Sequence, residues 1–387
     1  MQFSRVWLTL ALTAGVLAAP ATVYADSPSV AGSGGYTNGF VYLDNNTAGA
    51  NTISGFSRGP DGALTALPGS PFAAGGAGLG AGLASSDAIH VTDDGRYVLA
   101  VDAGSNQISV LRIGTDGSLT PVPGSPFSSG GVEPNSITEN DGLVYVSNTG
   151  AGATNYTGFA LSPWGQLVPI PGSTVTLPEG SAPGEIVLNG DNTKLAAMRV
   201  GTSVIDSFTL DRFGRPHAAP GSPFAAQGLG PFASRFRPTN PNQLFVDIAH
   251  DGAGLGTVSA YNDLPDGQLL SIGASPFADF QTAPCWQVIS PEGRYLYALD
   301  TGSAEISAYE IAWNGTLTLL SNTPVSATPG VTGTDIALSP DGHTLYLNMA
   351  KVDGVGEFAV DGGTVAQLPG SPVKATGSAT TAGIAAS

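Results

Sequence analysis

The sequence has little cysteine, little positive charge and no long apolar run after its start. Cys285 is the only cysteine, so no intramolecular disulfide can form and stability must come from packing. Lys and Arg number 13 against 30 Asp and Glu, a net charge of −17. Nucleic-acid binding requires basic side chains that replace counterions, so we predict no nucleic-acid partner. Without a later apolar stretch of spanning length, we also predict no membrane span.

The first residues show the pattern of a secretory signal peptide. Arg5 precedes a mostly apolar run over 6–17, and Val23-Tyr24-Ala25 places small residues before Asp26. We predict a signal peptide over 1–25, a flexible Gly/Ser lead-in over 26–35, and a secreted or periplasmic protein. Residues 36–387 carry no linker, so we expect one domain there, and a monomer.

A four-part unit, clearest at 285–325, repeats along the chain. Its apolar or alternating runs at 285–289, 294–299, 306–311 and 316–320 are separated by Gly, Pro, Asn and Asp turns, which predicts four antiparallel strands, A to D. The glycine that opens strand D recurs every 48 to 55 residues, at Gly62, Gly117, Gly165, Gly214, Gly267, Gly315 and Gly363. Seven such units predict an all-β, seven-bladed β-propeller.

The two ends of the repeat predict how the ring closes. The C-terminal run 380–387 resembles a strand A with nothing after it, whereas the first unit begins with a strand B at 40–43. We therefore expect the C-terminal strand to pair into the first blade, since this removes two open sheet edges. The variable B–C turns and D–A crossings then share one face of the ring, where loops on a rigid scaffold place a site.

Two segments resemble a known family. The run Thr92-Asp93-Asp94-Gly95-Arg96-Tyr97-Val98-Leu99-Ala100-Val101-Asp102 and the blade opening Gly228-Leu229-Gly230-Pro231 are similar to those of the seven-bladed lactonase propellers, the 6-phosphogluconolactonases and the related Tyr-Val-Thr-Asn surface propellers. The resemblance implies the propeller fold over the whole domain. It implies lactone hydrolysis only where the polar residues of the family are present.

Those polar residues are replaced here. The Arg-His pair of the family falls on Phe232 and Ala233, its Asn-Glu on Asp247 and Ile248, and its Asp-Arg on Asn106 and Gln107. Lactone opening needs a base to activate water and a donor for the oxyanion. Our first hypothesis is therefore a propeller that binds a small polar ligand or a protein partner on the variable face. The alternative is a divergent hydrolase of an unphosphorylated lactone.

The starts of the strands A supply the candidate site residues, because they approach the central channel. For the alternative, Asp87, Glu185 or Asp335 would act as base and Arg235 as oxyanion donor. For binding, Asn135 and Trp286 would contact the ligand, the indole stacking on a sugar. Trp286 can equally fill space between blades.

The ends of the strands B supply a second group. Asp44, Asp102, Asn148, Asp247 and Asp300 are assigned equivalent places, and Asp102, Asp247 and Asp300 are counted as candidate ligand contacts. Such a ring could bind calcium, or each residue could cap its own turn. His250, in the longest B–C loop, is a further candidate contact. No local histidine spacing indicates zinc, so we predict no metal or cofactor, with calcium as the only candidate.

Overall fold

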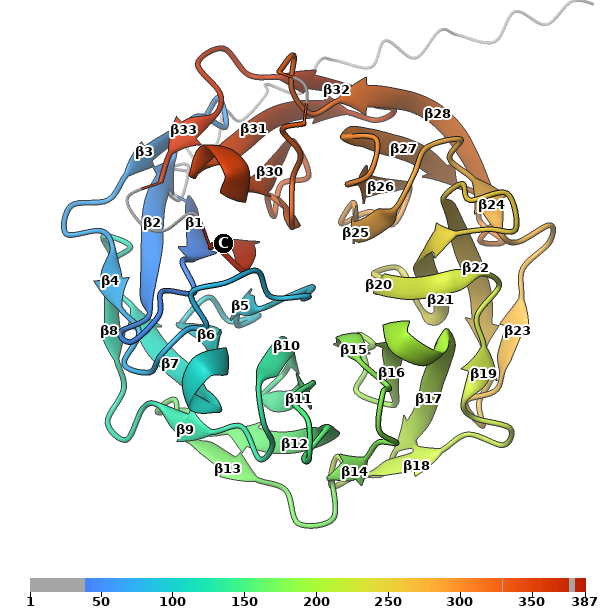
Figure 1. The fold of residues 1–387 in the computed structure, drawn as a ribbon, viewed down its shortest axis with the longest axis horizontal. Coiled ribbons are helices and arrows are strands. Elements are labelled where there is room, and N and C mark those ends of the chain that lie inside the picture. The colour runs from blue at the N-terminus through green and yellow to red at the C-terminus, as the bar shows by residue number, and fades with distance from the viewer. Residues whose placement is uncertain (1–38, 329, 376–379) are drawn as a thin grey trace, which may run out of the picture. The chain divides into compact units, whose positions relative to one another are not determined.

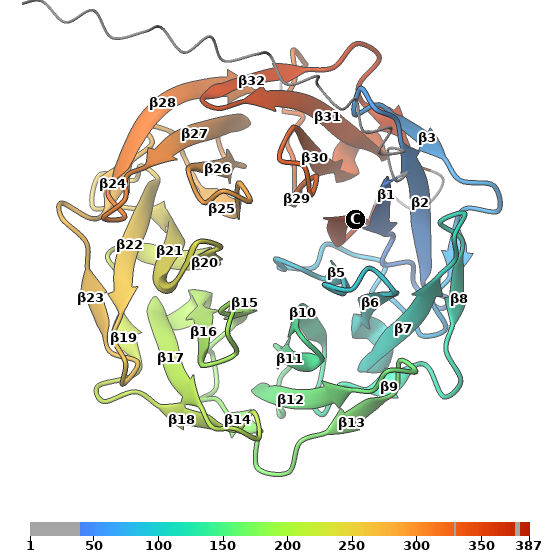
Figure 2. The ribbon, with the colours of Figure 1, turned by 180° about the vertical axis from the view of Figure 1, so that it is seen from behind.

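The computed structural model describes residues 39–328, 330–375 and 380–387. The predicted signal peptide and lead-in lie outside these ranges. Seven antiparallel sheets surround a central channel (Figure 1), and the same ring is seen from behind in Figure 2. The predicted all-β, seven-bladed propeller is confirmed. No helix among the residues described is long and apolar enough to cross a membrane.

Each blade has four main strands that run outward from the channel. The innermost strands, A, are β34 (Gly383–Ala386), β5 (Ile89–Val91), β10 (Pro134–Asn140), β15 (Pro183–Leu188), β20 (Leu229–Arg237), β25 (Pro284–Ile289) and β29 (Ile336–Leu338). The strands B are β1 (Gly39–Asp44), β6 (Tyr97–Asp102), β11 (Leu143–Asn148), β16 (Lys194–Arg199), β21 (Asn240–His250), β26 (Tyr295–Asp300) and β30 (Thr344–Met349).

The outer half of each blade follows the same order. The strands C are β2 (Thr52–Arg58), β7 (Gln107–Ile113), β12 (Asn155–Leu161), β17 (Val204–Leu210), β22 (Thr257–Asp263), β27 (Glu305–Ile311) and β31 (Gly354–Asp361). The strands D are β3 (Leu64–Ala66), β8 (Leu119–Pro121), β13 (Leu167–Pro169), β18 (Pro216–Ala218), β23 (Leu269–Ser271), β28 (Leu317–Pro324) and β32 (Thr364–Gln367). Three B–C turns contain 3₁₀ turns, η1 (Ala103–Ser105), η2 (Val200–Thr202) and η3 (Ala350–Val352).

The outermost strand is broken in two in six blades, which the sequence did not predict. After strand D the chain turns at the Pro-Gly-Ser-Pro segment or its relative and pairs again with strand C through a two-residue strand. These are β4 (Phe72–Ala73), β9 (Phe127–Ser128), β14 (Val175–Thr176), β19 (Phe224–Ala225), β24 (Phe277–Ala278) and β33 (Val373–Lys374). At the break, the side chain of the turn serine accepts the hydrogen bond that a continuous strand would accept through its backbone. Ser125 Oγ, for example, accepts from the Val110 N–H at 2.9 Å, so this strand C donor keeps a partner.

Tyrosines on the strands B connect neighbouring blades. The Tyr42 hydroxyl donates to Gly117 O at 2.9 Å, and Tyr346 donates to Gly62 O at 2.8 Å. Both acceptors lie in the C–D turn of the next blade, at the glycine whose recurrence predicted seven units. These glycines have positive φ, such as 84° at Gly62, which a side chain would strain. In blade 7 the residue with positive φ is Gly362, one before the predicted Gly363.

The C-terminal strand closes the ring as predicted. In the sheet of blade 1, β34 pairs antiparallel with β1, with Leu43 opposite Ile384. Ile384 is buried in a core cluster with Val41, Leu43 and Phe56 of blade 1 and Tyr346 of blade 7. The last strand of the chain therefore joins the first blade to the last.

Candidate functional site

The central channel is crossed by residues 84–87, the segment that leads into β5. It reaches towards β20 and β25 in Figure 1. The Ser85 carbonyl accepts from Trp286 Nε1 at 2.7 Å, and the Ser86 N–H donates to Gly184 O at 3.2 Å. The Asn135 amide donates to Ala84 O at 2.9 Å. One D–A crossing thus connects blade 2 with blades 3, 4 and 6 through the channel.

The predicted charged residues meet at this crossing. Arg235 forms ion pairs with Asp87, at 2.8 Å, and with Glu185, at 2.5 Å. Asp87 reaches it from a left-handed backbone conformation (φ 59°), which short polar side chains tolerate better than most. The convergence proposed from the sequence is therefore present in the structure, and Arg235 is already neutralised by two carboxylates.

Glu185 has no free side to offer a substrate. Its side chain is fully buried, and its oxygens accept from Ser86 Oγ at 2.8 Å, Ser234 Oγ at 2.6 Å, the Ser234 N–H and Arg235. Burial raises the pKa of Glu185 to about 7, against the opposing effect of Arg235. Burial acts to lower the pKa of Arg235, but the Asp87 and Glu185 carboxylates outweigh it and raise that pKa. This network joins blades 2, 4 and 5 electrostatically.

Asp335 lies in the same charged environment but makes local bonds. Its oxygens accept from the Ile336 N–H at 2.9 Å and from the Ile384 N–H of β34 at 3.0 Å. Burial, followed by the nearby Asp87 charge, raises the pKa of Asp335 well above its usual range. Asp335 therefore holds the closing strand in place.

A pocket of about 260 Å³ lies beside this network, among loops of the variable face. Trp286 and Phe232 form its aromatic wall, with ring centroids 5.4 Å apart in an edge-to-face arrangement. We call it the mouth pocket. It is lined by Gly82, Leu83, Ala84, Phe232, Trp286, Thr334, Ala350, Thr380 and Thr381. None of these side chains is charged, so the mouth pocket suits a small neutral ligand.

The remaining predicted contacts do not share one ring. Asp44 and Asp247 pair with the second residue of strand C, Ile53 and Val258. The other three pair with its first residue: Asp102 with Gln107, Asn148 with Asn155 and Asp300 with Glu305. A shift of one residue places side chains on opposite faces of a blade. The assignment of five equivalent places is therefore wrong. Of the five, Asp44 is the one whose oxygen accepts from its own turn, at the Asn46 N–H. His250 ends β21 with an exposed side chain.

The two sets of carboxylates face each other across blade boundaries. Between blades 1 and 2, Asn51 Nδ2 donates to Asp44 Oδ1 and to Asp102 Oδ1, at 3.0 Å each. The residue before strand C that corresponds to Asn51 is Gly256 in blade 5, and a Cβ there would lie 2.4 Å from Asp279 Oδ2. The boundary between blades 5 and 6 thus holds a third carboxylate in place of an amide.

This boundary contains buried oxygens without partners. Both oxygens of Asp247 and the Tyr309 hydroxyl have no hydrogen bond, and one oxygen each of Asp279 and Asp300 has no donor unless the two carboxyl groups share a proton. Burial raises the pKa of Asp247 and of Asp300 well above the usual range, and the neighbouring carboxylates add to it. Asp279 was not among the predicted residues, because only the folded crossing places it between two strands B.

Comparisons with known proteins bear on the fold. Protein-family models give no match, and neither do curated protein sequences. Among solved structures, a putative 6-phosphogluconolactonase from Bacteroides uniformis superposes with a TM-score of 0.70 at 18% identity, over 90% of this chain and 99% of that one. The periplasmic gluconolactonase PpgL of Pseudomonas aeruginosa gives 0.67 at 15% identity, over 90% and 98%. The resemblance to lactonase propellers is thus confirmed for the fold.

Replacing Arg235 tests the role of the charged network. We expect Arg235→Gln to lower the free energy of unfolding by about 3 kcal/mol at pH 8, because it leaves buried carboxylates unpaired. The loss should be smaller at pH 5.5, where Glu185 holds a proton. Urea unfolding at both pH values measures it, with Arg96→Gln as control for an exposed ion pair. Equal losses at the two pH values would contradict the electrostatic role.

Proposed function

We propose that this protein is an exported, monomeric propeller of the lactonase fold that binds a small neutral ligand in the mouth pocket without chemical conversion. One observation carries the proposal. An aromatic pocket opens among the variable loops, while the charged groups beside it are satisfied by one another. A site built for an anion would need a cation free to meet it, and Arg235 is engaged by Asp87 and Glu185.

The ligand class follows from the lining. Trp286, 7% exposed, and Phe232 give the pocket an apolar aromatic wall, and Thr334, Thr380 and Thr381 line the same pocket. Each of these hydroxyls donates within the protein, so it would meet a ligand as an acceptor. A ring with one apolar face and several hydroxyls, such as an unphosphorylated sugar or sugar lactone, fits both features. Two structures of the same fold are named as lactonases, which supports a lactone as one form of the ligand. The net charge of −17 disfavours phosphorylated forms.

Export rests on the signal-peptide pattern at the start of the sequence. The similar P. aeruginosa protein is named as periplasmic, which agrees with that pattern. The acidic composition also agrees, because it favours solubility and selects against polyanionic partners.

Fluorescence of Trp286 tests binding directly. In residues 26–387, Trp164 and Trp313 are the other tryptophans, 72% and 88% exposed, so changing both to Phe leaves Trp286 as reporter. We expect glucose or glucono-1,5-lactone to cause a saturable change in fluorescence, and their 6-phosphates to bind at least tenfold more weakly.

Phe232→Ala should weaken binding about tenfold, whereas Phe213→Ala, on the exposed surface, should not. No saturable change with any of these compounds up to 10 mM would refute the proposal.

A second function is supported by one specific contact. A carboxyl group with a pKa of about 7 lies 2.5 Å from a guanidinium, as a general base and an oxyanion donor would in a lactone hydrolase. The full burial of Glu185 and its four donors argue for the structural role instead. Turnover separates the two functions.

A further inference from the structure

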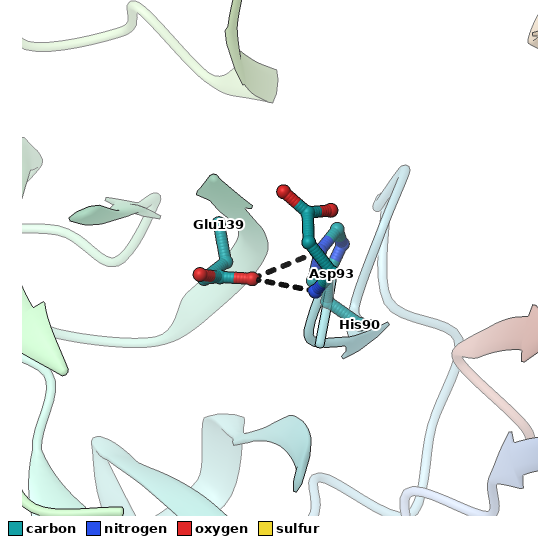
Figure 3. A group of neighbouring side chains, drawn as sticks. All are labelled: His90, Asp93 and Glu139. Atoms are coloured by element: carbon teal, nitrogen blue, oxygen red, sulfur yellow. Dashed lines mark hydrogen bonds and ion pairs between the residues drawn. The ribbon is translucent and has the colours of Figure 1, made fainter. Parts of the chain in front are cut away.

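His90, Asp93 and Glu139 come together as neighbouring side chains (Figure 3). They lie at the A–B turns, and the mouth pocket is formed by D–A and B–C connections at the other ends of the strands. His90 belongs to β5, Asp93 to the turn that follows it, and Glu139 to β10 of the next blade. One ligand atom from each of the three lies within 4.8 Å of the others, and no other His, Cys, Asp or Glu group in the described ranges meets this criterion. The distance from His90 Nε2 to Glu139 Oε2 is 4.0 Å.

The histidine nitrogen is left without a partner. The Nε2 atom of His90 is buried and forms no hydrogen bond. Burial of a polar atom without a hydrogen-bond partner costs free energy. This nitrogen faces Glu139 Oε2 across 4.0 Å, which is the span of two metal–ligand bonds of about 2 Å, so the two atoms would bind one ion from opposite (trans) sides, as in six-coordinate geometry.

Glu139 is held in position for this role. Its side chain is 3% exposed, and its oxygens accept from the Gly142 N–H at 2.7 Å and the Asp93 N–H at 3.0 Å. Each oxygen keeps a second lone pair. Backbone donors that orient a carboxylate in this way are typical of the groups around metal ligands. They also fix the turn that carries Asp93.

The surroundings of the three side chains provide space for water ligands and a local negative charge. A solvent-connected cavity of about 290 Å³ borders Asp93 and Glu139 and has room for water molecules. The nearby cation, Arg96, is paired with Asp94 at 2.5 Å, so it does not neutralise Asp93 or Glu139. Two carboxylates and a neutral imidazole together balance the charge of a dication.

We propose that His90, Asp93 and Glu139 bind a divalent transition-metal ion, with water from the adjoining cavity completing its coordination. One imidazole and two carboxylates suit Zn²⁺, Mn²⁺, Co²⁺ or Ni²⁺, whereas Ca²⁺ and Mg²⁺ prefer oxygen ligands alone. The ion would join strand A of blade 2 to strand A of blade 3. From the sequence we predicted no zinc site, because the histidines form no local motif. This group has no local motif either, since Glu139 is 49 residues from His90. The proposal is independent of the mouth pocket.

Titration of residues 26–387 with Zn²⁺ and Mn²⁺, followed by calorimetry, tests the site. We expect one equivalent to bind and the midpoint of thermal unfolding to rise with metal concentration. His90→Gln and Asp93→Asn should each weaken binding by about 100-fold, since loss of an outer-shell group alone costs 10- to 100-fold. His343→Gln, a histidine in the A–B turn of blade 7, should leave it unchanged.

A Cu²⁺ spectrum identifies the ligand itself. Electron paramagnetic resonance of the one-to-one complex should show coupling to one imidazole nitrogen, lost in His90→Gln and kept in His343→Gln. Asp93 is exposed, so its variant should fold normally and keep the test valid if His90→Gln unfolds. Absence of binding at 1 mM Zn²⁺, or affinity unchanged in both His90→Gln and Asp93→Asn, would overturn the proposal.

Discussion

The free energy of unfolding is expected to increase by at least about 4 kcal/mol when the pH falls from 8 to 5.5. Burial raises the pKa of Asp44 and of Glu185 to about 7, from ordinary values near 4. Between these values the folded protein holds both protons and the unfolded chain releases them. Stability is therefore lost as the pH rises towards 7, and regained on acidification. Over the 1.5 pH units from 7 to 5.5, each group contributes about 2 kcal/mol, so the two together contribute about 4 kcal/mol.

Urea unfolding between pH 5 and 8.5 measures this dependence. Asp247, Asp300 and Asp335 should add to it, because their pKa values are also raised by burial. The high negative charge acts in the same direction, since protonation reduces repulsion within the folded state. A stability that stays constant or increases from pH 5.5 to 8 would contradict the buried carboxyl groups.

Asp279→Asn provides a sharper version of the same test. Its Oδ1 accepts from the Gln281 N–H at 2.6 Å, and an asparagine keeps this bond. The new amide replaces the unpartnered Oδ2 and can donate to Asp300, as Asn51 donates to Asp102. We expect a gain of about 1–3 kcal/mol at pH 8 and a weaker pH dependence. Asp266→Asn, which changes an exposed turn with the same local bond, is the control.

Removal of residues 380–387 should destabilise the ring by at least about 5 kcal/mol. The deletion removes Ile384 from its core cluster and leaves β1 with an unpaired edge. Deletion of a buried isoleucine side chain alone costs about 2–5 kcal/mol, and the lost ladder adds to it. The first and last blades would also lose the Ile384 N–H bond to Asp335.

Thermal and urea unfolding of the truncated chain measure this effect. Ile384→Ala should reproduce about half of the loss, and a peptide of sequence 380–387 added in trans should restore part of it. Removal of residues 26–35, the predicted lead-in, serves as the control and should change stability by less than about 0.5 kcal/mol. A truncated chain as stable as the parent would show that the ring does not depend on its C-terminal strand.

The blades could be predicted because their signals are local. The turn glycine, the Tyr-containing alternation of strand B and the apolar run of strand A recur within each unit, and each has a direct structural cause, as Tyr42 and Gly117 show. Ring closure was also predictable from local patterns. The C-terminal run resembles a strand A that belongs to no blade, and the first blade lacks a strand A, so the two are expected to pair. The break of the outermost strand in six blades was not predicted, because the Pro-Gly-Ser-Pro sequence indicates a turn but not the short strand after it.

The site was predictable only in part, because packing between distant segments determines which ion pairs and hydrogen bonds its side chains form. Arg235, Asp87 and Glu185 were expected near one another from their place in the repeat, and they form ion pairs. Their mutual neutralisation depends on the path of residues 84–87 across the channel, which no local pattern encodes. A one-residue difference in register places Asp247 and Asp300 on opposite faces of their blades, and the sequence of the repeat alone does not reveal this difference.

Hydrolysis of an unphosphorylated lactone tests the central claim most directly, namely that the mouth pocket binds while the charged network only supports the fold. The rate of glucono-1,5-lactone opening at pH 7.5 is measured for residues 26–387, for Arg235→Gln and for buffer alone. The account predicts one rate for all three, together with saturable binding at Trp286. A rate above buffer that falls in folded Arg235→Gln would assign chemistry to Arg235 and Glu185 and contradict it.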